Sequence, residues 1–224
     1  MSGRGRMALF DLDGTLLSGD TDTLWCEFLI GEGVLDRAAF SAANREVAER
    51  YAAGAISPGE FCAFYAATLS GRTASQWQPL RNRFVESWIV PRIPAAAREL
   101  VGQHRRAGDR LVLTTATNRF LAEPIAHEFG IGELVATELA RADDVFTGRT
   151  AGVLNMRQGK VDRLRDGLAR EAGPAGWAEA TFYSDSINDL PLLAAVGRPV
   201  AVDPDAKLAG EAQRRGWPVL HLVR

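Results

Sequence analysis

The sequence has few of the residues that build thiolate and imidazole metal centres. Among 224 residues there are two cysteines and three histidines, and His104, His127 and His221 show no metal-ligand spacing. Zinc chemistry is therefore disfavoured. Cys26 and Cys62 both lie in apolar helical patterns. We favour packed free thiols over a disulfide, although the pattern leaves both open.

The sequence also lacks long apolar runs and an excess of charge of either sign. No segment supplies the roughly 18 consecutive apolar residues of a membrane span, and the first residues lack the apolar core of a signal peptide. The net charge of -2 gives no reason to expect nucleic acid or an anionic membrane as a partner. We therefore expect a cytoplasmic protein with neither partner, whose oligomeric state the sequence leaves open.

Short apolar runs alternate with helical patterns over the second half of the chain. Strands are predicted at residues 6–10, 110–116, 180–184, 199–202 and 218–222, and helices at 94–106, 119–129, 161–170, 189–196 and 206–215. Residues 133–158 are predicted to form a short strand and a hairpin that turns at Thr147 and Gly148. The alternation is typical of an α/β fold with a doubly wound, mainly parallel, Rossmann-like sheet.

Residues 18–90 do not join this alternation. The segment is poor in strands, and its spacing predicts helices at 21–30, 36–53, 58–69 and 73–87. Because it follows the first strand, we interpret it as an inserted α-helical cap domain over the carboxyl end of the sheet, where open α/β sheets bind ligands. Residues 1–17 and 91–224 would then form the core domain.

The strongest motif is FDLDGTL, residues 10–16, in which an apolar strand runs directly into Asp11 and Asp13. Two carboxylates so close together repel each other unless a turn solvates them or a cation holds them. Asp13 and Gly14 are ordinary turn formers, which is the simpler alternative. The same carboxylates could instead be oxygen ligands of Mg²⁺.

Three later stretches place polar residues at strand ends or helix starts. LVLTTATN contains Thr114, Thr115 and Ala116, QGKVDRL contains Lys160, and YSDSINDLPLL contains Asp185, Asn188 and Asp189. In this order, the four stretches resemble the motifs of the haloacid dehalogenase-like superfamily. Together with SDSIND, the helical insertion resembles its phosphoserine phosphatase-like branch, over nearly the whole chain.

The resemblance implies a Mg²⁺-dependent phosphomonoester hydrolase that works through an aspartyl-phosphate. It implies that Asp11 is the nucleophile and a metal ligand, and that Asp185 completes the metal site. Asp13 would be the general acid and base, with its backbone carbonyl on the metal. Such a carboxylate nucleophile divides phosphoryl transfer into two in-line steps.

The remaining motif residues are assigned by the same resemblance. Thr115, favoured over Thr114, would hydrogen-bond a phosphoryl oxygen. Lys160 would offset charge on the phosphoryl group and on the nucleophile, and Asp189 would orient Lys160. Asn188 would position the phosphate or a water. The backbone amides of Leu12 and Ala116 would donate to phosphoryl oxygens.

The substrate is a small phosphorylated metabolite whose identity depends on the insertion. In the resembled branch an acidic residue soon after the first motif contacts the substrate amine, and Asp20 matches it, with Asp22 as a near alternative. Either aspartate could simply cap the helix that begins near Thr23.

One departure from the branch bears on specificity. Phosphoserine phosphatases carry an arginine on a cap helix, but GEFCAFYAATL, residues 59–69, has neither Arg nor Lys. Arg45, Arg50, Arg72 or Arg81 could reach in from elsewhere. We hypothesise an amine-bearing phosphomonoester without a carboxylate, such as histidinol phosphate, and keep phosphoserine as the alternative.

The hypothesis names candidate contacts in the insertion. Asp20, Asp22 or Glu60 would face the amine, and the candidates for an apolar wall are Trp25, Phe61, Phe64 and Tyr65. The simpler interpretation of these aromatics is packing within the insertion.

Two other functions remain open. A phosphotransferase or mutase would pass the phosphoryl group to a second hydroxyl, and a catalytically idle protein would only bind a phosphorylated ligand. Every motif position holds a competent residue type, which argues against the idle protein.

Overall fold

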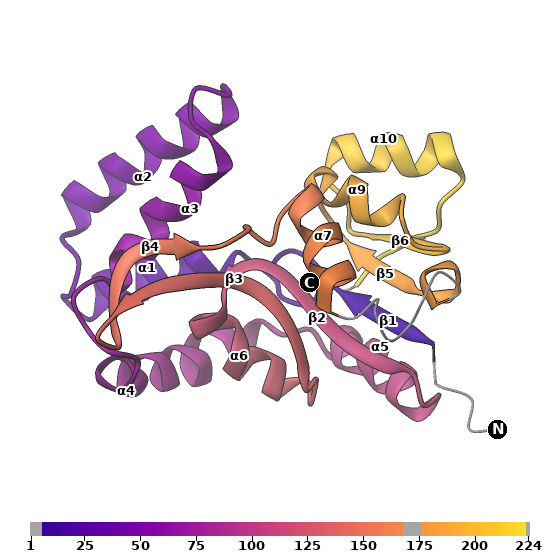
Figure 1. The fold of residues 1–224 in the computed structure, drawn as a ribbon, viewed down its shortest axis with the longest axis horizontal. Helices are drawn as coiled ribbons and strands as arrows, with labels where there is room; N and C mark the ends of the chain where they lie inside the picture. Colours follow the sequence, from indigo (N-terminus) through magenta and orange to yellow (C-terminus); the bar gives the residue numbers. More distant parts are fainter. Residues whose placement is uncertain (1–5, 168–175, 223–224) are drawn as a thin grey trace.

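A seven-stranded sheet forms the centre of the structure, a computed structural model that describes residues 6–167 and 176–222 (Figure 1). Its strands are β1 (Met7–Phe10), β2 (Arg110–Asn118), β3 (Glu133–Ala142), β4 (Val145–Ala151), β5 (Thr181–Ser184), β6 (Arg198–Val202) and β7 (Val219–Leu220). They lie in the order β4-β3-β2-β1-β5-β6-β7, and every neighbouring pair is parallel except β3 and β4. The predicted doubly wound, mainly parallel α/β fold is confirmed.

The two faces of the sheet are covered by different helices, as the period-two alternation of a strand requires. Ala8 and Phe10 belong to the hydrophobic cluster that includes α5 (Ala95–Arg106) and α6 (Arg119–Glu128). Met7 and Leu9 belong to the cluster that includes α7 (Gln158–Gly167), α9 (Leu190–Leu193) and α10 (Ala206–Arg215). Figure 1 shows these two layers on opposite sides of the strands. The central strand β1 is thus buried on both faces and fixes the position of Asp11.

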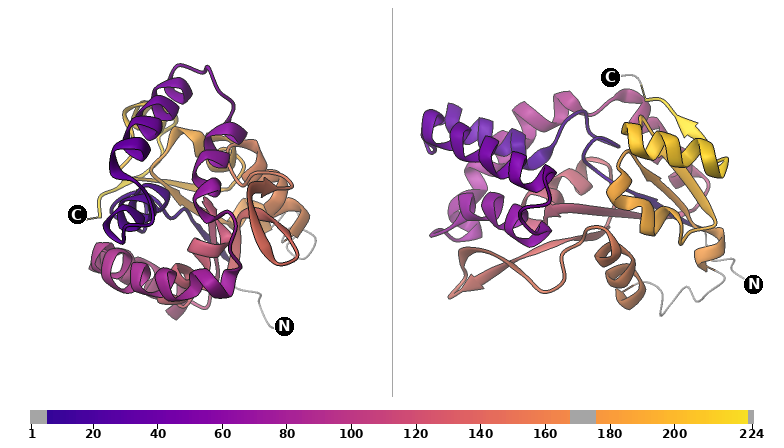
Figure 2. Two further views of the ribbon diagram at one scale, coloured as in Figure 1. Left: turned by 90° about the vertical axis from the view of Figure 1, so that its left-hand side faces the viewer. Right: turned by 90° about the horizontal axis from the view of Figure 1, so that it is seen from above.

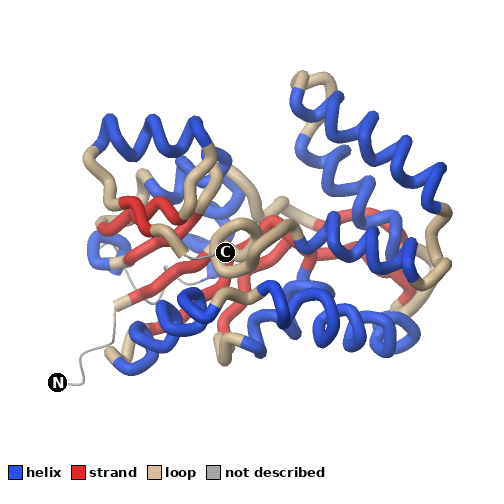
Figure 3. The backbone as a smooth tube through the Cα atoms, turned by 180° about the vertical axis from the view of Figure 1, so that it is seen from behind, coloured by secondary structure: helices blue, strands red, loops and turns tan. Residues whose placement is uncertain are grey.

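Between β1 and β2 the chain forms a helical insertion. It contains α1 (Thr21–Gly31), α2 (Arg37–Ala52), α3 (Pro58–Ala66) and α4 (Ala74–Phe84), with single-turn elements at Ala67–Leu69, Val85–Ile89 and Val90–Arg92. Each α-helix begins at a side-chain N-cap, as polar cap residues favour: Asp20, Asp36, Ser57 and Thr73. Figures 2 and 3 show that α2 projects away from the sheet and that α3 runs back beside α2 to strand β4, whereas α4 continues the layer of α5 and α6.

The hydrophobic core does not stop at the boundary of the insertion. Trp25 of α1 and Phe84 of α4 are buried in the same cluster as Phe10 and Leu113 of the sheet. The helices α1 and α4 are therefore packed on the core, and α2 and α3 are the outlying part. The division into a core and an 18–90 cap domain stays a prediction.

The predicted hairpin is present, but its turn is not at Thr147 and Gly148. The chain turns at Asp143 and Asp144, whose φ angles of +50° and +64° suit a two-residue hairpin turn. Gly148 lies inside β4 instead. A Cβ there would lie 3.2 Å from Ala67 Cα. The glycine therefore allows β4 to approach the end of α3.

Other predicted boundaries shift for local reasons. The helix predicted at 73–87 ends as an α-helix at Phe84 and continues as a π turn over Val85–Ile89, and the 3-10 turn Val90–Arg92 follows it. The helix predicted at 189–196 is reduced to α9 after a 3-10 turn at Ile187–Asp189. The helix predicted at 161–170 begins at Gln158, and its residues 168–170 lie outside the described part.

Two predictions drawn from absences can also be compared with the structure. Cys26 and Cys62 are both free, which confirms packed thiols over a disulfide. Within residues 6–167 and 176–222, none of the helices combines the length and apolarity needed to span a bilayer.

Candidate active site

A cavity of about 230 Å³ lies where β1, β2 and β5 end, and residues of α3 and of the turn before α1 also line it. The predicted motif residues that line it are Asp11, Asp13, Thr115, Ala116, Lys160, Asp185, Asn188 and Asp189. They come from segments far apart in the sequence, and the parallel sheet brings them to one edge because its strands end there together.

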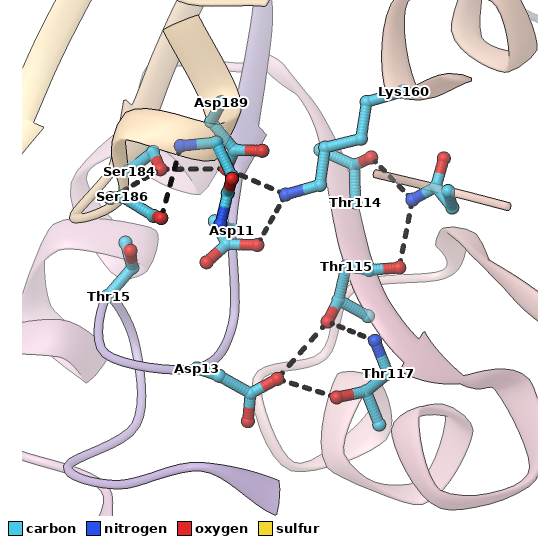
Figure 4. A network of polar contacts seen from close by, with 12 residues as sticks. Asp11, Asp13, Thr15, Thr114, Thr115, Thr117, Lys160, Ser184, Ser186 and Asp189 are labelled. Atoms are coloured by element: carbon cyan, nitrogen blue, oxygen red, sulfur yellow. Dashed lines mark hydrogen bonds and ion pairs between the residues drawn. The ribbon is translucent and has the colours of Figure 1, made fainter. Parts of the chain in front are cut away.

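Lys160 connects two of the aspartates. Its Nζ donates to Asp11 Oδ1 at 2.6 Å and to Asp189 Oδ2 at 2.7 Å, and only 2% of its side chain is exposed. Burial alone would lower the pKa of Lys160, but the charges of Asp11 and Asp189 outweigh it and raise that pKa. Ser184 Oγ also donates to Asp189 Oδ2. The lysine is therefore a fixed ammonium ion beside Asp11 (Figure 4).

The carboxyl group of Asp11 is in an electrostatically strained position. Burial raises its pKa well above the usual value, the charge of Lys160 opposes this rise, and Asp189, Asp185 and Asp13 add to it. One ammonium ion thus faces several carboxylates. Additional positive charge near Asp11 would lower its pKa and favour the ionised carboxylate.

The side chain of Asp13 is turned away from Asp11 toward a set of threonines (Figure 4). Thr117 Oγ1 donates to Asp13 Oδ2 at 2.6 Å, and Thr115 Oγ1 donates to the same oxygen at 3.3 Å. Asp13 Oδ1 accepts from the backbone N–H of Thr21 at 2.7 Å and from its hydroxyl. Burial and the charge of Asp20 raise the pKa of Asp13 to about 6, against the hydrogen bonds of Thr117 and Thr21. Such a pKa suits a group that both donates and accepts a proton near neutral pH.

Asp185 approaches the turn of the first motif closely. Thr15 Oγ1 donates to Asp185 Oδ1 at 2.9 Å and accepts from the Asp185 backbone N–H at 3.0 Å. A Cβ on Gly14 would lie 2.1 Å from Asp185 Oδ2, so only glycine fits there. Burial raises the pKa of Asp185 to about 6, against the hydrogen bond from Thr15.

Only two of the three motif carboxylates are placed where they could bind a metal ion. Over the described residues, no three His, Cys, Asp or Glu side chains form a group suited to hold a metal ion. One reason is that the Asp13 carboxylate is occupied by threonines. The carboxylates of Asp11 and Asp185 remain. Two carboxylates, waters and a substrate phosphate form the usual surroundings of Mg²⁺ in phosphoryl-transfer sites.

The two threonines at the end of β2 have different positions. Both are fully buried, but Thr115 lines the cavity, whereas the Thr114 hydroxyl accepts from Asn155 Nδ2 at 3.0 Å. Leu12 is fully buried, and its carbonyl accepts the N–H of Leu16 at 2.9 Å in the turn after Asp11. The predicted phosphate contacts of the Leu12 and Ala116 amides stay predictions.

Asp20 and Asp22 both line the cavity. Asp20 also accepts from Thr23 N at 2.7 Å, so it caps α1 while facing the cavity. Asp22 accepts from Asn118 Nδ2 at 3.3 Å. Burial, then the charges of Asp20 and Asp13, raises the pKa of Asp22 well above its usual value. A cation bound beside Asp22 would relieve this cost.

Three of the predicted specificity residues do not line the cavity. Trp25 is 1% exposed and packs against Phe84 at 5.1 Å in the core, because α1 turns that side toward α4. Glu60 is exposed and forms the capping box of α3 with Ser57. Phe64 stacks on Phe40 at 5.2 Å.

The α3 residues that do line the cavity are Phe61, Cys62 and Tyr65, which share one side of the helix. Phe61 and Tyr65 were among the candidates for an apolar wall. Cys62 is half-buried against the cavity, and this burial raises the pKa of its thiol to about 12.

Sequence reasoning missed the residues that hold the catalytic groups. Thr117 and Thr21 orient Asp13, and Thr15 holds Asp185. Asn155 is fully buried and donates to three acceptors on β2 and β3. Thr15 is part of the first motif and could have been assigned, but the others depend on contacts across the fold.

Comparisons with known proteins agree with this geometry. A family model described as haloacid dehalogenase-like hydrolase matches residues 8–194. A histidinol-phosphatase of Neisseria meningitidis is 37% identical over 96% of this chain and 98% of its own length. A phosphoserine phosphatase of Mycobacterium tuberculosis is 31% identical over 95% of this chain and 69% of its own length.

A solved structure shows the same fold. A phosphoserine phosphatase with bound substrate has a TM-score of 0.70 at 15% identity, covering 98% of this chain and 94% of that one. The family match over most of the chain and the two relatives above 30% identity lead to one conclusion: the chain belongs to the haloacid dehalogenase-like hydrolases and is a phosphatase.

Proposed function

We propose that this phosphatase is a Mg²⁺-dependent phosphomonoesterase whose substrate is a small metabolite with an amine and no carboxylate, such as histidinol phosphate. One observation supports this choice of substrate. Among the described residues that line the cavity, Lys160 has the only cationic side chain, and it is already paired with Asp11 and Asp189. On the same cavity, Asp20 and Asp22 offer negative charge.

The proposed chemistry gives Asp11 and Asp13 different roles. An Asp11 oxygen attacks phosphorus, the bond to the leaving alkoxide breaks, and protonated Asp13 gives the alkoxide its proton. In the second step water attacks the aspartyl-phosphate, Asp13 takes the water proton, and Asp11 and inorganic phosphate are released. The pKa of about 6 for Asp13 supports both roles.

Asp11 and Asp185, with the backbone carbonyl of Asp13, would hold the Mg²⁺ ion. The ion would supply positive charge that stabilises phosphoryl oxygens and ionised carboxylates. The raised pKa values of Asp11 and Asp185 support this proposal, because burial of the two carboxyl groups outweighs the opposing charge of Lys160. Thr115, Asn188 and the amides of Leu12 and Ala116 would contact the phosphate.

Residues 18–90 would act as the cap that closes the cavity. Its α3 residues Phe61 and Tyr65 supply aromatic surface, and Asp22 supplies charge. An amine would face the aspartates, and an aromatic group would lie against the rings. The 37% identical histidinol-phosphatase supports this substrate class.

Phosphoserine is the second candidate, because the relative from Mycobacterium tuberculosis carries that name. Its carboxylate would enter a cavity whose described lining holds no free cation. An unpaired carboxylate next to aspartates binds poorly, so we rank phosphoserine below histidinol phosphate.

The test replaces each specificity aspartate with asparagine. Asp22→Asn and Asp20→Asn remove charge, and asparagine still caps α1 at residue 20. We expect the KM for histidinol phosphate to rise about tenfold or more, with a change of less than about twofold for p-nitrophenyl phosphate, which has no amine. Glu60→Gln is the matched control, because Glu60 is exposed and caps α3.

Two results would refute the proposal. One is an unchanged KM for histidinol phosphate in both aspartate variants. The other is alcohol release without an equal amount of inorganic phosphate, which would identify a phosphotransferase.

A further inference from the structure

Arg157 stands out by its backbone conformation. It lies just before α7 with a φ of +51°. The other non-glycine residues with positive φ in the described ranges are the aspartates Asp143, Asp144 and Asp203. Aspartate tolerates this region because its short side chain can bond locally, but arginine has no such help. Contacts elsewhere must therefore favour this conformation of Arg157.

The Arg157 guanidinium group contacts two separate parts of the molecule. Its Nε donates to Asn188 Oδ1 at 3.1 Å, in the loop after β5. Its Nη2 donates to the Tyr51 hydroxyl at 3.1 Å, near the end of α2. One side chain thus bridges the outlying helices and the loop that carries Asp185 and Asn188. We call Tyr51, Arg157 and Asn188 the arginine clasp.

Both ends of the arginine clasp lead to the cavity. Asn188 lines it directly. The Tyr51 ring stacks on Phe61 with centroids 4.4 Å apart and an interplanar angle of 25°, and Phe61 also lines the cavity. Phe61 and Asn188 belong to different elements, so the clasp fixes the spacing of two cavity walls.

We propose that Arg157 is a positioning residue that holds α2 and α3 over the cavity through the arginine clasp. The kinetic effects expected from this role rest on the proposed function. A guanidinium group suits this role, because its planar fork presents several donors at fixed angles. A lysine ammonium at the same place could not hold both acceptors in this geometry. Substrate enclosed between Phe61 and Asn188 is retained while the clasp is formed.

The test removes both hydrogen bonds of the Arg157 guanidinium group in one variant and only the bond to Tyr51 in the other. Arg157→Asn keeps a residue that tolerates a left-handed conformation but is too short to reach Tyr51. Tyr51→Phe removes the hydroxyl and keeps the ring on Phe61. Arg50→Gln is the matched control, since Arg50 is an exposed neighbour on α2 whose ion pair at 3.6 Å is with Glu46.

Amide hydrogen exchange of the unliganded protein is the first measurement. We expect exchange in α2 and α3 to be about threefold to tenfold faster in Arg157→Asn and in Tyr51→Phe, with unchanged exchange in β1 and β2 and no change for Arg50→Gln. Unchanged exchange in α2 and α3 would overturn the arginine clasp, whatever the substrate is.

A double-mutant cycle on the KM for histidinol phosphate is the second measurement. Each single variant is expected to raise KM about threefold to tenfold, and the double variant no further, because both changes break the same bridge. Arg157→Lys should not restore KM. Additive effects would contradict the proposal, and a rise confined to phosphoserine would make Arg157 a carboxylate ligand instead. Absence of phosphate release by the unmodified protein would refute the proposed function and leave the exchange result to decide the arginine clasp.

Discussion

The three threonines around Asp13 set both its direction and its acidity. Hydrogen bonds from Thr117 and Thr21 stabilise the carboxylate and oppose the effect of burial on its pKa. Thr115 lines the cavity and also contacts Asp13, so the residue proposed to bind phosphate touches the residue proposed to transfer the proton. Small changes here should alter the pH dependence before they alter the fold.

Thr117→Val tests this arrangement. Loss of the hydroxyl removes a hydrogen bond to the carboxylate, so the pKa of Asp13 rises further above about 6. The second step needs Asp13 as a carboxylate, so the ascending limb of the plot of kcat against pH should move to higher pH. Thr117→Ser keeps the hydroxyl and should keep the limb in place. An unmoved limb in Thr117→Val would contradict the role given to Asp13.

Asp11→Asn tests the nucleophile. An amide cannot attack phosphorus, so phosphate release should fall by at least about a thousandfold. Lys160 keeps its contact with Asp189, so the variant should remain folded. Circular dichroism and thermal melting check that point. Substantial turnover by a folded Asp11→Asn variant would remove Asp11 from the mechanism.

At the scale of single residues, the sequence predicts the candidate catalytic residues better than the residues that hold them in place. Asp11, Asp13, Lys160 and Asp185 could be named because each lies in a short motif that resembles the family pattern. Thr117 could not, because its role depends on β2 lying beside β1. The same holds for Trp25, since helical spacing does not say which neighbour covers a given face.

At the scale of elements, the buried side chain of Asn155 attaches the loop before α7 to the sheet. Asn155 Nδ2 lies 2.9 Å from the Thr115 carbonyl oxygen and 2.8 Å from the Val135 carbonyl oxygen. These bonds join β2, β3 and the loop that leads to Lys160. The register between β2 and β3 shifts between Thr115 and Asn118, so the backbone groups there need such a partner.

Asn155→Ala should therefore weaken both stability and catalysis. The buried acceptors lose their donor, which should lower the free energy of unfolding by about 2 kcal/mol. Displacement of Lys160 should also lower kcat. Denaturant unfolding and phosphate release measure the two effects. Asn82→Ala, on the exposed side of α4, is the control and should change stability by less than about 0.5 kcal/mol. Equal stability of the two variants would contradict the structural role of Asn155.

Element boundaries show where local signals mislead. Thr147 and Gly148 indicate a turn because glycine is the strongest turn former, yet the turn uses Asp143 and Asp144. Aspartate tolerates positive φ, so two adjacent aspartates were a usable signal. The demand for glycine at residue 148 comes from Ala67 of the insertion, which no local pattern reveals.

At the scale of the whole molecule, the acidic cavity makes stability depend on pH and on cations. The pKa values of Asp13 and Asp185 are raised to about 6 in the fold. A raised carboxyl pKa means that the folded state holds more protons than the unfolded state. Without a cation, the contribution of Asp13 and Asp185 to stability is therefore greatest below the ordinary carboxyl pKa, and it is lost as pH rises through about 6.

Bound Mg²⁺ should reverse this loss. The ion favours ionised Asp11 and Asp185, so the rise in melting temperature on adding Mg²⁺ to chelator-treated protein should be larger at about pH 7.5 than at about pH 5. Asp185→Asn should lose most of this gain. An equal gain at both pH values, or a full gain in Asp185→Asn, would exclude the proposed metal site.

The overall architecture could be predicted because each strand and helix has a clear period. The alternation of buried strands and amphipathic helices specified a parallel sheet, and the helical insertion followed from its lack of strands. How closely α1 and α4 share the core could not be predicted, since Trp25 and Phe84 would fit a separate helical core equally well.

The most direct test compares kcat/KM for histidinol phosphate and for phosphoserine in the presence of Mg²⁺. Both carry an amine, and phosphoserine also carries a carboxylate. Among the described residues that line the cavity, Lys160 has the only cationic side chain, and it already donates to Asp11. We predict a preference for histidinol phosphate of about a hundredfold. Equal values, or a preference for phosphoserine, would contradict the account.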